Sequence, residues 1–399
     1  MKIDEIVIGG TKKRKSRDSR SHRTVQKDFF SSVPEAELKE NKNSARIQHI
    51  EDLILWSGSK GAMAAVDKLR QVEAQPHSVT IKWDGRPAVI FGRNESGEFV
   101  LTDKSGFGAK GYNGRVTSAE ELEQMLLARG KKDEQTRSEF PAKMKGIWSK
   151  VESVVPADFR GYVLGDLLYF TTPPADNSGK LRFQPNTTEY AVDVNSVVGK
   201  QIQDSDVGIV VHKYIDTDGK IANVDVSRFQ QGDALIMPPA VVTKAPGVDL
   251  PEVDEVEKFI KSKASAIDKM FAVPAELKIS DFGDILYQYI NASVKSGATG
   301  KYNLQHFMNW LDTSKVSNAK KARLAEYLQQ NQEGFAATFE IITRLQNVKN
   351  AVIKALDAQE ADVEAYTDGE RGGEGYVIDK DVKLVNRAGF TAANMARNN

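Results

Sequence analysis

Apolar residues recur along this chain with two different periods. Before residue 70 a spacing of three and four positions predicts two short amphipathic helices, one on each side of Gly58, with apolar residues at Ile47, Ile50, Leu53, Ile54, Ala62, Ala65, Val66 and Leu69. Short runs rich in β-branched and aromatic residues follow, separated by Gly, Asp and Asn turns. These runs predict strands at 78–81, 88–91, 99–102, 162–169, 190–194, 208–214 and 224–226.

The helical period returns after the proline-containing segment 246–251 and persists to residue 357. We expect helices at 253–270, 279–296, 304–311, 318–330 and 334–357. The last one carries a single apolar stripe, which we interpret as core rather than as a partner-binding face: Phe335, Phe339, Ile342, Leu345, Val348, Val352 and Leu356. A final hairpin is predicted at 375–378 and 382–385. The pattern therefore favours an α+β fold, with a largely antiparallel sheet that a helical insertion interrupts.

These changes divide the chain into four parts. Residues 1–44 form an arm, 45–245 the first part of a core, 246–365 a helical insertion domain, and 366–399 the final hairpin of the core. The arm is basic between Lys12 and Lys27, with Asp18 as the only acid there, and we expect it to be disordered. It is either a tail that binds phosphate groups in a salt-dependent way or a solvated terminus.

Composition excludes several classes of protein. With 399 residues, 40% hydrophobic and 28% charged, the chain is typical of globular proteins and not of fibres or coiled coils. It has no apolar run of membrane-spanning length and no apolar leader, so we expect no membrane contact and a cytoplasmic location. It has no cysteine, which excludes disulfides, thiolate zinc sites and cysteine nucleophiles.

The candidate chemistry centres on Ile81-Lys82-Trp83-Asp84-Gly85, where a lysine precedes an Asp-Gly turn at the end of a predicted strand. An amine held there can attack a nucleotide α-phosphate and form a phosphoramidate, provided that burial or neighbouring cations leave part of it uncharged. By itself, the pattern Lys-x-Asp-Gly is more often an exposed hairpin.

Polar residues on later strands favour the chemical interpretation. In chain order they are Lys104-Ser105-Gly106, Gly165-Asp166-Leu167, the run 208–214 with His212 and Tyr214, Glu374-Gly375-Tyr376-Val377, and Val382-Lys383-Leu384-Val385. With the Lys82 segment they resemble motifs I, Ia, III, IIIa, IV and V of the covalent nucleotidyltransferases, the superfamily of ATP-dependent DNA and RNA ligases and mRNA capping enzymes. Singly, Asp166 is also compatible with a strand-end carboxylate, His212 with a core histidine, and Lys383 with an edge-strand charge.

The residues around these motifs carry a second resemblance. The segments 49–54, 79–90, 183–187 and 208–212 look like a ligase-like family encoded by large tailed bacteriophages, and this resemblance extends from Ile47 to the C-terminus. It implies an antiparallel-sheet nucleotidyltransferase core of ATP-grasp type with a large helical insertion. It also implies a protein of the infected bacterial cell. The superfamily resemblance implies ATP as cofactor and a role in nucleic acid repair, and we expect a monomer.

The superfamily resemblance implies a role for each matching residue. Lys82 would become adenylylated by ATP, and Asp84 and Gly85 would form the turn that aims it. Lys383 would contact the α-phosphate and disfavour protonation of Lys82, so both lysines are catalytic candidates. Contacts with the nucleotide are also implied for Ile81, Arg86 and Lys104.

The same resemblance implies a metal and a base site. Asp166 and Glu374 would hold Mg²⁺ or the ribose hydroxyls, since hard oxygen ligands suit this ion. Either His212 or Tyr214 would stack on adenine, with Val377 on its other side.

The chain also departs from the superfamily pattern. Pro87 stands where an arginine is common, Asp166 replaces a glutamate, and Val385 replaces a second lysine, for which Lys380 or Arg387 could compensate. Too few residues follow Lys383 for the OB-fold domain of DNA ligases and capping enzymes. The missing cysteine disfavours NAD-dependent ligases, which carry a zinc finger.

These features favour an ATP-dependent polynucleotide ligase that joins 5′-phosphate and 3′-hydroxyl ends of RNA. The alternatives are a DNA nick-sealing ligase without an OB domain and a nucleotide-binding virion-associated protein with impaired ligase chemistry. Basic residues at 315–323 are either a phosphate-binding face for RNA or DNA strands or a solvated helix face.

Overall fold

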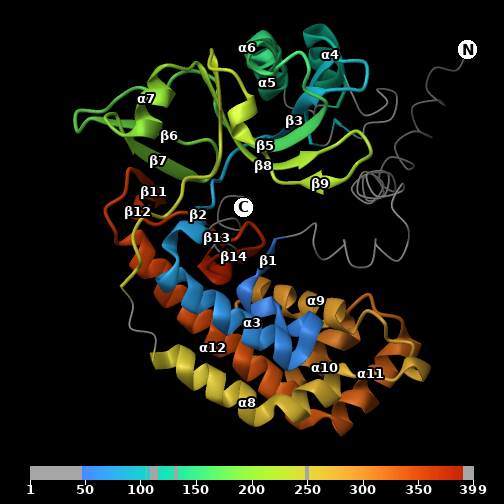
Figure 1. Cartoon of the computed structure of the whole chain (residues 1–399). Helices are drawn as coiled ribbons and strands as arrows, with labels where there is room; N and C mark the ends of the chain where they lie inside the picture. Colours follow the sequence, from blue (N-terminus) through green and yellow to red (C-terminus); the bar gives the residue numbers. More distant parts are fainter. Residues whose placement is uncertain (1–46, 105, 108–115, 130–133, 248–250, 390–399) are drawn as a thin grey trace, which may run out of the picture. The chain divides into compact units, whose positions relative to one another are not determined.

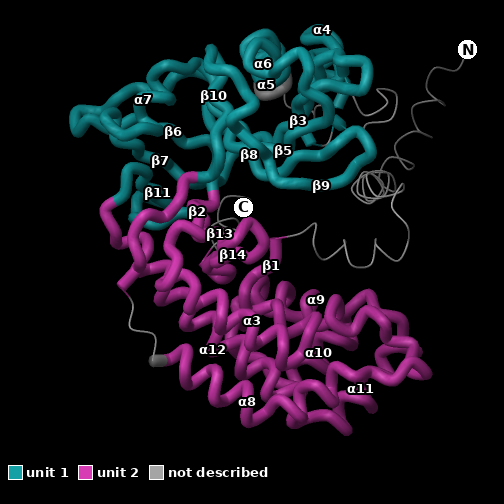
Figure 2. The backbone as a smooth tube through the Cα atoms, viewed as in Figure 1, with its two compact units in different colours: residues 1–43, 83–239, 361–373 teal, residues 44–82, 240–360, 374–399 magenta. Residues whose placement is uncertain are grey.

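The computed structural model describes residues 47–104, 106–107, 116–129, 134–247 and 251–389. Their contacts separate the chain into two compact units (Figure 2). Unit 1 includes residues 83–239 and 361–373, and unit 2 includes residues 44–82, 240–360 and 374–399. Residues 47–82 of the predicted core thus group with the predicted helical insertion, because their apolar side chains share one hydrophobic core with its helices. The predicted basic arm lies outside the described residues.

The large sheet of unit 1 has six strands in the order β10-β8-β5-β3-β4, with β9 also paired to β8 (Figure 1). All its pairs are antiparallel except β8 with β10, which is parallel. The predicted strands at 88–91, 99–102, 162–169 and 208–214 are confirmed. The observed bounds are β3 (Ala88–Arg93), β4 (Phe99–Asp103), β5 (Gly161–Tyr169), β8 (Val207–Ile215), β9 (Ile221–Ala222) and β10 (Ala234–Met237).

Three helices cover one face of this sheet: α4 (Ala119–Arg129), α5 (Glu134–Gly146) and α6 (Trp148–Val154) (Figure 1). Alternate strand residues such as Val89, Phe91 and Val163 pack against them in one buried cluster. The sequence did not predict these helices, because α5 contains Pro141 and α6 has only seven residues. The opposite face carries a smaller apolar cluster and several of the polar residues that matched the motifs.

The predicted strand at 224–226 is wrong. Residues Val226–Arg228 form a 3₁₀ turn, because the carboxylate of Asp225 accepts hydrogen bonds from Ser227 N at 3.1 Å and Ser227 Oγ at 2.6 Å. Such local side-chain bonds compete with strand pairing.

A second, four-stranded sheet of unit 1 has the order β12-β11-β7-β6. Its strands are β6 (Lys180–Phe183), β7 (Thr188–Asp193), β11 (Val363–Thr367) and β12 (Glu370–Arg371), and α7 (Val197–Gln203) follows β7. One face buries Trp83 against Phe183 and Tyr190, with ring centroids at 6.2 and 4.4 Å. The segment 361–373, which follows the helices of unit 2 in the chain, thus completes a sheet of unit 1.

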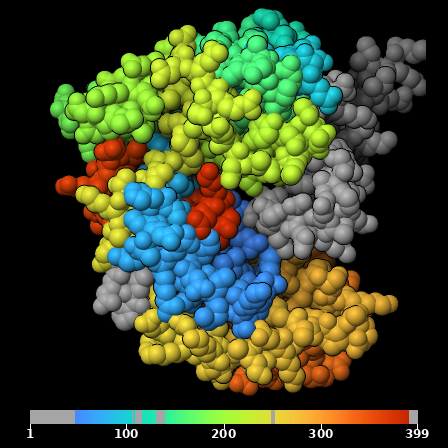
Figure 3. Space-filling view, viewed as in Figure 1, coloured from blue at the N-terminus to red at the C-terminus, as the bar shows by residue number. Residues whose placement is uncertain are grey.

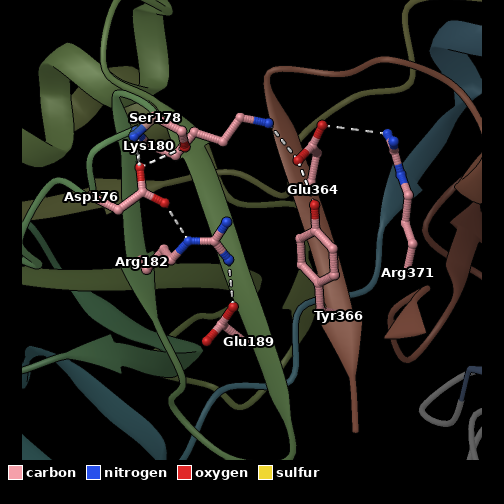
Figure 4. Close-up of polar contacts among 8 residues, drawn as sticks. All are labelled: Asp176, Ser178, Lys180, Arg182, Glu189, Glu364, Tyr366 and Arg371. Carbon is pink, nitrogen blue, oxygen red and sulfur yellow. Dashed lines mark hydrogen bonds and ion pairs between the residues drawn. The ribbon is translucent and has the colours of Figure 1, made fainter. Parts of the chain in front are cut away.

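The other face of the small sheet carries a network of charged side chains (Figure 4). Glu364 accepts hydrogen bonds from Lys180 Nζ at 2.5 Å and from the Tyr366 hydroxyl at 2.8 Å, and it forms an ion pair with Arg371 at 3.5 Å. Arg182 binds the carboxylates of Asp176 and Glu189. The network joins all four strands of this sheet.

Unit 2 is built mainly from helices, and α12 lies at the centre of its core. The seven apolar stripe residues of α12 are buried, which confirms their interpretation as core. Figure 3 shows the side chains of α3 against those of α8. The bounds are α3 (Ile54–Ala74), α8 (Pro251–Phe271), α9 (Phe282–Lys295), α10 (Leu304–Thr313), α11 (Asn318–Gln330) and α12 (Gln332–Asp357). Among the helices within the described ranges, none has the length and apolarity to cross a membrane.

The two predicted N-terminal helices are found on either side of Gly58: the first consists of the 3₁₀ turn η1 (Ile50–Asp52) and the first residues of α3, and the second is the rest of α3. A break at Ser57 and Gly58 remains inside α3, where Gly58 has a φ of 57°. Asp268 of α8 caps the second part of α3, because its carboxylate accepts from Ser59 N at 2.8 Å and from Ser59 Oγ at 2.7 Å.

A four-stranded sheet of unit 2 brings distant segments together in the order β1-β14-β13-β2. The strands are β1 (Gln48–His49), β2 (Val79–Ile81), β13 (Tyr376–Ile378) and β14 (Val382–Leu384). The predicted final hairpin is confirmed as the antiparallel pair β13 and β14. Strand β13 also pairs with β2, antiparallel.

The charged network of the small sheet gives a pH-dependent prediction. Burial alone raises the pKa of Glu364, but hydrogen bonds from Lys180 and Tyr366 and the nearby positive charges outweigh it and hold this pKa below its ordinary value. A depressed folded-state pKa stabilises the fold above the unfolded-state pKa of about 4.3, and this contribution is lost as pH falls through the folded pKa. We expect Glu364→Gln to lower the free energy of unfolding by about 1 kcal/mol at pH 7 and by less at pH 3.

Urea unfolding followed by circular dichroism at the two pH values measures this difference. Glu95→Gln, in an exposed turn of unit 1, is the matched control and should unfold like the parent protein. If the free energy of unfolding changes equally with pH in the parent and in Glu364→Gln, the lowered pKa of Glu364 is contradicted.

Candidate functional site

The sheet of unit 2 aligns residues from four segments in one row. Thr80 is the register partner of Val377, Val377 of Lys383, and Lys383 of His49. Register partners point to the same face of a sheet, and side chains alternate between faces along a strand. The other face is apolar and buried in the core of unit 2, with Val79, Tyr376, Ile378, Val382 and Leu384. The row therefore lies on the face opposite this core.

Lys82 follows β2 directly and meets Glu374, which precedes β13. The backbone N–H of Lys82 donates to the carbonyl of Gly375 at 2.8 Å, and the ammonium of Lys82 forms an ion pair with the Glu374 carboxylate. The Lys82 side chain is 26% exposed and that of Glu374 10% exposed. The predicted nucleophile thus remains accessible beside a nearly buried acid. Ile81 packs against the core instead, and its N–H donates to Ala240.

His49 was missed as a candidate site residue, although it begins the segment 49–54 that resembles the phage family. Burial, followed by the positive charges of Arg387, Lys383, Lys349 and Lys82, holds the pKa of His49 well below its ordinary value. Its imidazole is therefore neutral at pH 7. Because the charges of Lys82 and Lys383 both lower the pKa of His49, both lysines lie near this histidine.

Two buried ion pairs lie next to this row. Nζ of Lys349 on α12 is 2.7 Å from Oε1 of Glu51, and Arg387 pairs with Asp52. All four side chains are buried. Buried pairs cost desolvation, but removing one partner leaves an uncompensated charge. These pairs connect η1 to α12 and to the segment after β14. They therefore hold in place the residues that follow β1, which carries His49, and β14, which carries Lys383.

The Asp-Gly turn after Lys82 is held in unit 1. Both oxygens of Asp84 are engaged: they accept from Asn186 Nδ2 at 2.9 Å, Thr187 N at 2.9 Å and Thr187 Oγ1 at 2.5 Å. The N–H of Asp84 donates to the Tyr190 hydroxyl at 2.6 Å. Asp84 is 8% exposed, so this carboxylate anchors the turn rather than facing solvent.

Gly85 allows the turn to lie against β5. A Cβ on Gly85 would be 2.5 Å from Cβ of Asp166 and 2.9 Å from the carbonyl of Leu167, so a larger residue does not fit. The N–H of Arg86 donates to Leu167 O at 2.9 Å, while its side chain is exposed. The turn and Asp166 are thereby brought together within unit 1.

Asp166 is paired with His212. Oδ2 of Asp166 lies 2.9 Å from Nε2 of His212, and the two side chains are 23% and 28% exposed. A carboxylate in this position fixes the ring orientation of the histidine. Lys104 is exposed near Lys213, whose pKa is lowered by burial and by the charge of Lys104.

Tyr214 does not share this environment. Its hydroxyl donates to Arg160 O at 2.6 Å, and its ring packs edge-on against Phe159 at 5.8 Å, within the cluster covered by α4, α5 and α6. A register shift between Leu164 and Gly165 separates its face from that of His212. Of the two predicted stacking residues, only His212 adjoins Asp166.

The predicted metal ligands do not form a preassembled cluster. Within the described ranges, no group of three or more His, Asp or Glu side chains is arranged to hold a metal ion. Asp166 bonds to His212, and Glu374 pairs with Lys82. Mg²⁺ commonly binds one or two carboxylates together with substrate phosphates and water, so each of these carboxylates by itself suits an ion that arrives with ATP.

The basic segment 315–323 is largely occupied by internal contacts. Lys320 binds Asp281 at 2.8 Å, Lys321 donates to Asp312 O at 2.6 Å, and Arg323 donates to Leu277 O at 2.7 Å. These bonds favour a structural role over a phosphate-binding face.

Comparison with known proteins identifies a family. The model of a family described as a family of unknown function (DUF6267) matches residues 43–399. No curated protein and no solved structure matches the chain.

The anchor of Asp84 generates a testable prediction. Asn186→Ala removes a hydrogen bond to a nearly buried carboxylate, which costs about 1.5 kcal/mol. We expect amides 84–86 to exchange with deuterium about tenfold faster than in the parent protein, because the turn opens more often.

Hydrogen exchange with mass spectrometry of peptides covering residues 83–90 measures this change. Asn195→Ala, at an exposed turn position of the same unit, should leave the exchange of these peptides unchanged. The anchor is disproved if Asn186→Ala and Asn195→Ala behave alike.

Proposed function

This chain belongs to the family of unknown function DUF6267, and we propose that it is an ATP-dependent polynucleotide ligase that carries AMP on Lys82. The proposal joins the motif order of the sequence to the geometry of unit 2. One observation carries it. Two distant segments of the chain, one with Lys82 and the other with Glu374 and Lys383, meet at one short sheet, and Lys82 and Glu374 form an ion pair.

The first step is a transfer of AMP. Nζ of Lys82 attacks the α-phosphorus of ATP, the N–P bond forms, and the bond to the bridging oxygen breaks, so pyrophosphate leaves with the electron pair. Lys82 loses a proton in this step, and the Glu374 carboxylate beside it is the nearest described acceptor. Lys383 adds positive charge near the phosphates, which stabilises the transition state electrostatically.

The nucleotide contacts follow from the residues that match the motifs. Asp166 and His212 are candidates for the ribose and the adenine, respectively, and the ordered ring of His212 supports stacking. Asp166 or Glu374 would hold Mg²⁺, which neutralises phosphate charge and orients the leaving group when bound. Asp84 is assigned to the turn alone, because its oxygens are already bonded.

The acceptor is proposed to be an RNA strand end. AMP passes from Lys82 to a 5′-phosphate, and a 3′-hydroxyl then displaces AMP and seals the strand. The helices of unit 2 pack in one core with the lysine-bearing strands, as expected for an RNA ligase that carries a helical module. Nicked DNA is the competing acceptor and serves as one arm of the test.

Incubation with α-labelled ATP and Mg²⁺ tests the nucleophile. We expect an acid-labile, alkali-stable label on the parent protein and on Lys60→Ala, which changes an exposed lysine of α3. The label should fall below detection in Lys82→Ala and in Lys82→Arg, because a guanidinium keeps its charge and is not a nucleophile. Equal labelling of Lys82→Ala and the parent would refute the proposal.

The labelled protein then distinguishes the acceptors. Nicked RNA duplex, single-stranded RNA and nicked DNA are offered at equal concentration, and sealing is followed by gel electrophoresis. We expect AMP release and sealing with RNA ends. Sealing of nicked DNA alone would replace the RNA assignment by the DNA one, and a label that transfers to no strand would contradict ligation.

A further inference from the structure

His49 lies on β1, beside Lys383 of β14. We propose that His49 binds the pyrophosphate group of the nucleotide, next to Lys383, an inference that rests on the proposed transfer of AMP to Lys82. The ligand class is a di- or triphosphate anion. The sequence motifs did not include this residue, and its role follows from its place in the sheet of unit 2.

The order of the strands indicates the direction in which the pyrophosphate leaves Lys82. Lys82 follows β2, Lys383 lies on β14, and His49 lies on β1, the strand farthest from β2 in the order β1-β14-β13-β2. His49 and Lys383 are register partners, and neighbouring strands are about 4.8 Å apart, so the two side chains share one patch. A nucleotidyl transfer needs the attacking and leaving atoms roughly in line. A leaving group that points away from Lys82 along this row reaches Lys383 and then His49.

The charges around His49 suit an anion. The surrounding ionisable groups are Lys383 on β14, Arg387 after it, Lys349 on α12, Lys82 after β2, Glu374 before β13, and Glu51 and Asp52 on η1. Lys349, Arg387 and Lys82 are paired with Glu51, Asp52 and Glu374, yet the charges of Arg387, Lys383, Lys349 and Lys82 all lower the pKa of His49, so the field at its ring is positive. Nδ1 of His49 has no hydrogen-bond partner within the described part of the chain.

The imidazole of His49 is compatible with the site both before and after the anion binds. Without an anion, burial and then the neighbouring positive charges lower the pKa of His49 and keep it neutral, so it adds no further repulsion between cations. A neutral imidazole still offers one N–H donor to a phosphate oxygen. When a pyrophosphate anion binds, its negative charge offsets the field of the lysines and favours the protonated ring, which strengthens the contact.

Calorimetric titration of the full chain with inorganic pyrophosphate tests this site without ATP. His49→Leu removes both ring nitrogens, and we expect the Kd for pyrophosphate to rise about tenfold, the loss of one charge-assisted hydrogen bond. His49→Gln keeps a donor and should recover part of the affinity. His77→Asn, in the exposed segment before β2, is the matched control and should bind like the parent.

A second ligand separates a local contact from general damage. AMP lacks the β- and γ-phosphates, so its Kd should differ less than twofold between the parent and His49→Leu. An unchanged Kd for pyrophosphate, or an equal loss for AMP and pyrophosphate, would overturn the assignment. His49→Ala provides the same comparison if His49→Leu fails to fold.

The outcome is independent of the labelling of Lys82. Weaker pyrophosphate binding by His49→Leu in a protein that takes no label would support the anion site and refute the ligase. A protein that takes the label but whose pyrophosphate binding is unchanged in His49→Leu would support the ligase and refute the anion site. In a protein that labels, we also expect the release of ATP from the lysyl-AMP form by added pyrophosphate to slow about tenfold in His49→Leu.

Discussion

The pairing of β13 with both β2 and β14 is the constraint on which the candidate site depends. It places Val377 between Thr80 and Lys383, and it joins a segment near residue 80 to one near residue 380. A shift of one residue in the pairing register of β14 would turn the side chain of Lys383 toward the core and bring Val382 or Leu384 to the polar face. The buried apolar side of this sheet therefore fixes the chemistry of its other side.

The buried ion pairs complete this arrangement. The strands β1 and β14 are too short to be stable alone. The Glu51–Lys349 pair attaches η1, which follows β1, to α12, and the Asp52–Arg387 pair attaches η1 to the segment after β14. The helices of unit 2 thus have a direct role in the site: they hold the strands that carry His49 and Lys383. In unit 1, the bonds of Asp84 to Asn186 and Thr187 play the corresponding part for the turn.

Hydrophobic periodicity predicted the long helices and the main strands, because one regular face of each is buried. It did not predict α4, α5 and α6; of these, α5 contains Pro141 and α6 has only seven residues. The motif order named both Lys82 and Glu374 as site residues, and in the structure they form an ion pair, because β2 and β13 are paired. The sequence could not reveal that Lys349 is buried, because a lysine at its position is typical of an exposed helix face. It also could not reveal the position of His49. Both depend on contacts between residues about 300 positions apart. Tyr214 was named beside His212 because a register shift that reassigns faces leaves no mark in the sequence.

The central claim is that the amine of Lys82 forms a covalent bond to AMP. Intact-mass and tandem mass spectrometry of the full chain, after incubation with ATP and Mg²⁺ and digestion under alkaline conditions, tests it most directly. The account predicts one AMP per chain, located on Lys82 within the peptide that contains Trp83 and Asp84. AMP on another residue, or a chain that gains no mass, would contradict it.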